Sequence, residues 1–109
     1  MGKSAYAGRM TRSQFIAAVF LAPALPAFAA TVVVQKGRAF RPAEITINRG
    51  ETVTFTNDDS YIHQVYVEGL FDSPEKAPGE NLNETFPAAG TFQVRCHIHP
   101  TMKMTVKVR

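Results

Sequence analysis

The chain has 109 residues, with 12 basic and 9 acidic side chains, one cysteine, three histidines and no tryptophan. Three of the twelve basic residues and none of the acidic ones lie within the first 29 positions, which leaves nine of each sign in residues 30–109. This balance provides no positive surplus that would attract nucleic acid or an anionic membrane. A single cysteine excludes an internal disulfide, so a domain of this size is expected to gain stability from a metal.

The first 29 residues have the pattern of a cleavable export signal. An apolar run at Phe15–Leu25 follows a basic start, and Ala27–Ala29 supplies the small-x-small motif before the cut. The basic residues are Lys3, Arg9 and Arg12. The apolar run is shorter than the roughly 20 residues that span a bilayer. We therefore expect a signal peptide at 1–29, one domain at 30–109, a periplasmic location and no membrane association after cleavage.

Residues 30–109 are expected to form a single all-β domain. Short runs with alternating apolar and polar side chains recur every 8–12 residues or so, between Gly, Pro and Asn turns. In chain order the predicted strands are Val32–Val34, Glu44–Asn48, Glu51–Asn57, His63–Val67, Asn83–Phe86, Thr91–Cys96 and Met104–Val108. A bend is expected at 40–42 and a long irregular connection at 69–81. The pattern predicts an antiparallel sandwich or barrel of about seven to eight strands.

Strand parity places one histidine and the cysteine on inward faces. His63 begins its predicted strand on the face of Val65 and Val67, and Cys96 ends its strand on the face of Val94. The start of one strand and the end of an antiparallel neighbour lie at the same end of a sandwich. His63 is therefore expected to reach the loop that follows Cys96.

That loop is rich in metal-ligating side chains. Cys96, His99 and Met102 fall within seven residues, and Pro100 stiffens the segment between them. Together with His63 they offer two imidazoles, a thiolate and a thioether. Soft sulfur ligands select copper, imidazoles suit both of its oxidation states, and this set is typical of blue-copper electron-transfer sites.

The segment 96–102, Cys-His-Ile-His-Pro-Thr-Met, followed by a strand at 103–108, resembles the ligand loop of the cupredoxins. It is most similar to the amicyanin-, pseudoazurin- and plastocyanin-like group. The similarity extends to residues 57–67 and 90–92 and covers most of 31–109. It implies a Greek-key β-sandwich that binds one type 1 copper ion through His63, Cys96, His99 and Met102.

The resemblance also implies a function. It indicates a monomeric carrier, not an enzyme, that passes single electrons between redox partner proteins in transient encounters. A copper-delivery protein without an electron-transfer role would use the same residues and is the alternative. An enzyme with a cysteine nucleophile would need an oriented base and an oxyanion hole, which no pattern in the chain predicts.

Four residues near the predicted ligands have a second interpretation. Plastocyanin-like spacing would make Met104 the axial ligand, but Met104 shares the inward face of the last strand, which favours Met102. His97 has the opposite parity to the cysteine and is expected to be exposed or hydrogen-bonded. Gln64 stands where many cupredoxins have an asparagine that ties the ligand loops together, and it can form similar hydrogen bonds. Asn57 either joins that network or caps a turn.

Overall fold

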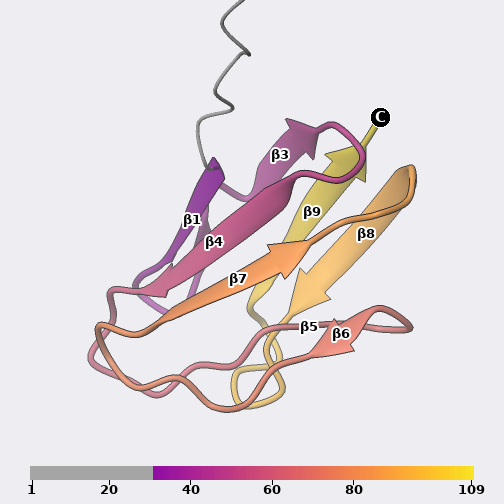
Figure 1. The fold of residues 1–109 in the computed structure, drawn as a ribbon. Helices are drawn as coiled ribbons and strands as arrows, with labels where there is room; N and C mark the ends of the chain where they lie inside the picture. The colour runs from indigo at the N-terminus through magenta and orange to yellow at the C-terminus, as the bar shows by residue number, and fades with distance from the viewer. Residues whose placement is uncertain (1–30) are drawn as a thin grey trace, which may run out of the picture.

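The computed structural model describes residues 31–109 (Figure 1). The predicted signal peptide and its cleavage point lie outside this range. Within it, no helix is long and apolar enough to cross a membrane. The described chain forms nine strands, three of them only two residues long: β1 (Thr31–Gln35), β2 (Phe40–Arg41), β3 (Glu44–Ile47), β4 (Thr52–Asn57), β5 (Tyr66–Val67), β6 (Phe71–Asp72), β7 (Asn81–Thr85), β8 (Gly90–Arg95) and β9 (Lys103–Val108).

The strands form two sheets that pack face to face, which confirms the predicted β-sandwich (Figure 1). One sheet has the order β2-β1-β4-β7 and the other the order β3-β9-β8-β5-β6. Most strand pairs are antiparallel as predicted, but β1 pairs in parallel with β4, and β3 with β9. Between β1 and β4 the chain crosses to the opposite sheet at β3 and then returns. Alternation of apolar residues reveals which face a side chain occupies, but not this crossover.

Three predicted elements differ from the observed ones. The expected bend at 40–42 contains β2, and the expected irregular connection contains β6. The predicted strand at 63–67 is regular only at Tyr66–Val67, and His63 instead forms an isolated antiparallel bridge with Lys76. His63 is nevertheless fully buried, together with Val65 and Val67 on the same face, although Gln64 between them is buried as well.

The core lies between the two sheets and follows the alternation of the strands. Along β4, Val53 and Phe55 are buried, and along β9, Met104, Val106 and Val108 are buried. Burying side chains of this size contributes about 1.5–3 kcal/mol each. The other buried members are Val33, Phe40, Ile47, Val65, Val67, Phe86, Val94, Cys96 and Met102.

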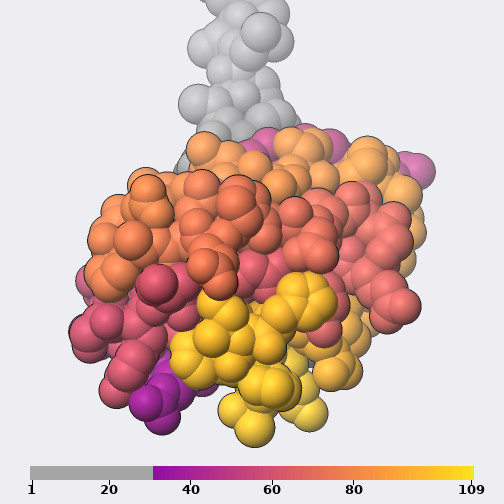
Figure 2. All heavy atoms as spheres, turned by 90° about the horizontal axis from the view of Figure 1, so that it is seen from below, coloured from indigo at the N-terminus to yellow at the C-terminus, as the bar shows by residue number. Residues whose placement is uncertain are grey.

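One end of the sandwich gathers loops from distant parts of the sequence. The segment that leaves β4 and the β8–β9 loop both lie at the end opposite the C-terminus (Figure 1). Seen from that end, the yellow β8–β9 loop packs beside the magenta-to-red segment around residue 60, with the indigo β1–β2 turn next to it (Figure 2). The fold thus brings the two predicted ligand segments together.

Candidate metal centre

Three of the predicted ligands converge at this end. One ligand atom from each of His63, Cys96 and His99 lies within 4.8 Å of the others. The two imidazoles face each other through their Nδ1 atoms, 3.1 Å apart, and the Cys96 Sγ is 3.9 Å from the Nδ1 of His99. His63 and Cys96 are buried, whereas His99 is half-buried. The predicted meeting of residue 63 with the C-terminal loop is confirmed.

The backbone of the loop after β4 is fixed by the buried amide of Asn57. Its Nδ2 donates to the carbonyls of Tyr61 and Lys76, at 2.8 and 2.9 Å, and its Oδ1 accepts from the backbone N–H of Asp59 at 3.0 Å. The His63 backbone N–H donates to the Lys76 carbonyl at 3.0 Å. Asn57 therefore acts as a cap that shapes the loop, the second of its two predicted roles.

Gln64 connects the two ligand segments. Its Oε1 accepts from the backbone N–H of His97 at 2.9 Å. Its Nε2 donates to the carboxylate of Asp72 and to the carbonyls of Val65 and Ser73. The side chain is consequently buried, although it alternates with the inward-facing His63 and Val65. The predicted role of glutamine as a link between the loops is confirmed.

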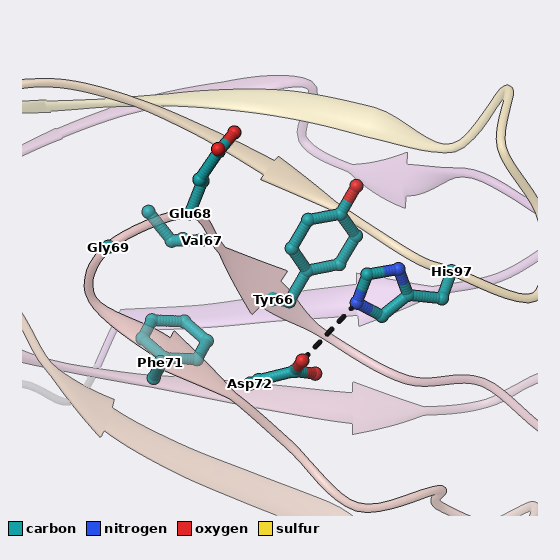
Figure 3. A pocket seen from close by; sticks show the side chains of 7 residues that line it. All are labelled: Tyr66, Val67, Glu68, Gly69, Phe71, Asp72 and His97. Carbon is teal, nitrogen blue, oxygen red and sulfur yellow. Dashed lines mark hydrogen bonds and ion pairs between the residues drawn. The ribbon is translucent and has the colours of Figure 1, made fainter.

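His97 lines an open groove on the side of the sandwich together with Tyr66 and Asp72 (Figure 3). Its ring stacks on that of Tyr66, with centroids 3.6 Å apart and planes 1° from parallel. Its Nε2 is 3.3 Å from the Asp72 carboxylate, and its side chain is 53% exposed. The expectation of an exposed, hydrogen-bonded histidine is confirmed.

The two methionines occupy different levels of the β8–β9 hairpin. The last antiparallel pair joins Arg95 with Lys103, so the next facing positions are Cys96 and Met102. Met104 faces Val94, one step deeper in the sheet. Both methionines are buried. The register therefore places Met102 at the level of the cysteine and Met104 among core residues.

A carboxylate that the sequence analysis did not single out contacts the first histidine. The Oδ2 of Asp59 lies 2.9 Å from the Nε2 of His63. The hydrogen bond from the backbone N–H of Arg38, followed by that from the His63 ring, holds the pKa of the Asp59 carboxyl below its usual range. Asp59 lies four residues before His63 in a polar loop, where an aspartate is equally typical of a turn.

The charge state of the second histidine also suits metal binding. Burial is the main cause that lowers the pKa of His99, and the neighbouring His63 and Arg38 lower it further. A metal ligand must be the neutral imidazole, so this environment favours the form that binds.

These donors match the chemistry of copper. Two imidazole nitrogens and a cysteine sulfur enclose a space of single-ion size, and a methionine stands at the same level of the hairpin. Soft sulfur with imidazole nitrogen is a donor set that copper favours. A β-sandwich that carries this set at one end has the architecture of a cupredoxin.

Comparisons with known proteins agree with this class. A family model described as copper-binding proteins of the plastocyanin/azurin family matches residues 28–109. A plastocyanin from Scenedesmus fuscus is 32% identical over 88 residues, which cover 64% of this chain and 86% of that protein. Amicyanin-alpha from Methylorubrum extorquens is 32% identical over 89 residues, which cover 76% of this chain and 74% of that protein. The chain belongs to the plastocyanin/azurin family of copper-binding proteins.

Solved structures show the same relationship. A reduced amicyanin variant superposes with a TM-score of 0.71 at 28% identity, covering 77% of this chain and 86% of that one. A purple cupredoxin from Nitrosopumilus maritimus gives a TM-score of 0.69 at 26% identity, covering 72% and 99%. A copper-containing nitrite reductase from Thermus scotoductus gives 0.70 at 29% identity, but only 24% of that longer chain is covered. The family and the site together establish a type 1 copper protein that binds one copper ion and carries single electrons.

Proposed function

We propose that residues 30–109 form a periplasmic electron carrier in which His63, Cys96, His99 and Met102 bind the copper ion. The observation that carries the assignment is the convergence of a distant buried histidine with the cysteine and histidine of the β8–β9 loop. When bound, copper supplies a one-electron couple between Cu(I) and Cu(II). The exported location is supported by the leader-like sequence of residues 1–29.

The surrounding residues hold the donors in fixed positions. Backbone hydrogen bonds join His63 to Lys76, and the Gln64 side chain joins the same segment to the residue after the cysteine. The ligand segments are therefore attached to the sandwich at several points. Such rigidity keeps the donor positions similar in both oxidation states, which suits electron transfer.

The surface beside His99 suits brief contact with a partner protein. The ring of Tyr61 lies 6.1 Å from that of His99. Tyr61, Ile62 and Ile98 are 44%, 48% and 40% exposed and adjoin the two histidines in sequence or in space. We infer that a monomer docks here through a small apolar contact, because electron-transfer interfaces typically bury less than about 1,200 Å².

The test of this function is the addition of Cu(II) to purified residues 30–109. We expect an intense thiolate-to-copper charge-transfer band, narrow copper hyperfine splitting in EPR and fast, reversible one-electron cycling at an electrode. A pale type 2 spectrum would contradict the assignment. Slow cycling with ready release of copper would indicate a delivery protein instead.

The assignment of the axial ligand can be tested with Met102→Leu and Met104→Leu as a matched pair. Exchange of methionine for leucine nearly conserves volume and typically costs less than about 1.5 kcal/mol in a core. Loss of an axial thioether removes electron donation to Cu(II), so we expect Met102→Leu to raise the reduction potential. A rise of about 59 mV or more is expected, which corresponds to a tenfold change in the ratio of Cu(II) to Cu(I) affinity. Met104→Leu should leave the potential and the visible spectrum unchanged. The opposite result in voltammetry would make Met104 the ligand.

A further inference from the structure

The contact between Asp59 and His63 has a consequence for the metal centre. We propose that Asp59 is a positioning residue whose carboxylate holds the His63 ring with Nδ1 toward the copper ion and lowers the reduction potential of that ion. This inference rests on the proposed ligand role of His63. It adds an outer carboxylate to the four proposed ligands.

The geometry fixes which ring nitrogen carries the proton. The Oδ2 of Asp59 is 2.9 Å from Nε2 of His63, and both side chains are buried, with the His63 ring fully enclosed. An ionised carboxylate only accepts hydrogen bonds, so Nε2 carries the hydrogen and Nδ1 keeps its lone pair. That Nδ1 faces the space shared with the Nδ1 of His99 and the Sγ of Cys96. Asp59 thereby selects the tautomer that a Nδ1 ligand requires.

The carboxylate is itself held by hydrogen-bond donors from two segments. Its Oδ2 accepts from the backbone N–H of Arg38 at 2.8 Å, and its Oδ1 accepts from that of Ser60 at 3.2 Å. With His63 this gives three donors to one carboxylate. Three donors favour the charged carboxylate and leave it little freedom to rotate away from the ring.

The donor from the β1–β2 turn requires an uncommon backbone. In the described part of the chain, Arg38 is the one residue other than glycine with a positive φ, at 53°, and it follows Gly37 at 62°. Two positive φ values between paired strands are those of a type I′ turn, which glycine and asparagine favour over arginine. A left-handed arginine persists where its surroundings determine it. Here the turn directs its N–H at Asp59, 21 residues away in sequence.

The charge of Asp59 acts on the ion through one imidazole ring. A carboxylate bonded to a ligating histidine raises the basicity of that ligand. Salt screens a buried charge less than an exposed one, so the Asp59 carboxylate should change the reduction potential more than a surface carboxylate does. Reduction adds one electron to Cu(II) to give Cu(I), with no proton transferred and no bond to the carboxylate made or broken. A fixed negative charge favours the more positive ion, so it opposes reduction.

The test compares Asp59→Asn with Asp58→Asn. The first removes the charge but keeps an amide oxygen that can accept from Nε2. The second removes the same charge from an exposed neighbour whose hydrogen bonds run through its backbone, to Gln35 and Lys36. In Asp59→Asn we expect the ratio of Cu(II) to Cu(I) affinity to fall by about tenfold or more, with the blue band retained. This fall corresponds to a rise of about 59 mV or more in the reduction potential. Asp58→Asn should shift the potential by less than a third of that. Equal shifts in the two variants, or none in Asp59→Asn, would overturn the proposal.

A measurement on the unmodified protein keeps the proposal testable if Asp59→Asn fails to fold. In the diamagnetic Cu(I) form, proton NMR should show the Hε2 of His63 as a downfield, slowly exchanging signal. Rapid exchange of that proton would overturn the role of Asp59. The unmodified Cu(II) spectrum separates the two hypotheses: a pale spectrum overturns the proposed function and this inference with it, whereas a blue band with an unshifted Asp59→Asn potential overturns this inference alone.

Discussion

Cys96→Ser is expected to abolish the blue band and to weaken Cu(II) binding by more than the 10–100-fold or so that is typical of an outer-shell change. The band arises from charge transfer between thiolate sulfur and Cu(II), and a serine hydroxyl supplies neither the soft donor nor the negative charge. Absorption spectroscopy and a competitive copper titration measure the two effects. The sulfur is buried at the end of β8, so the smaller hydroxyl leaves the surface of the protein unchanged.

His97→Ala is the matched control for this experiment. His97 follows the cysteine directly, but its ring stacks on Tyr66 outside the centre (Figure 3). The blue band should therefore persist in His97→Ala, with a stability loss of about 0.5–1.5 kcal/mol from the aromatic pair. A band that survives in Cys96→Ser, or one that is lost in His97→Ala, would refute the ligand assignment.

Local spacing was sufficient to place three of the proposed ligands close together. Cys96, His99 and Met102 lie in one short loop, so their proximity follows from chain length alone. His63 is distant in sequence, so its approach to this loop had to be predicted from the fold. The alternation of side chains along 63–67 indicated it, even though the predicted strand is mostly irregular. The prediction for His63 holds because His63, Val65 and Val67 are all buried, whereas the hydrogen bonds of Gln64 also bury the side chain between them.

The contacts around the site that were not predicted from the sequence are made by residues in turns and loops. Asp59 and Arg38 approach each other because of the β1–β2 turn and the loop after β4, and both belong to residue types common in any turn. Their contact depends on β1 lying parallel to β4, a crossover that alternation does not reveal. The proposed ligands thus follow from the chemistry of their side chains, whereas the outer contacts depend on strand order.

Phe86→Ala is expected to bring the metal-free domain close to unfolding. Phe86 follows β7 and is fully buried, with its ring 5.9 Å from that of Phe71 and 5.6 Å from that of Phe92. The Phe86 ring thus connects the edge of one sheet to the other sheet. Its truncation to alanine leaves a cavity, which should lower the free energy of unfolding by about 3–5 kcal/mol. A domain of this length has a free energy of unfolding of about 4–12 kcal/mol at the usual value per residue. Urea denaturation of the metal-free protein measures the loss.

Phe71→Ala provides the comparison, because Phe71 packs against the same ring but is only half-buried on the two-residue β6. Its truncation should cost about half as much or less, since part of the ring already contacts water. Copper should restore part of the lost stability in both variants, because an ion that binds only the folded state stabilises it by mass action. If Phe71→Ala lowered the free energy of unfolding as much as Phe86→Ala, the sheets would be joined chiefly through β6, and the position of Phe86 in the core would matter less than its burial indicates.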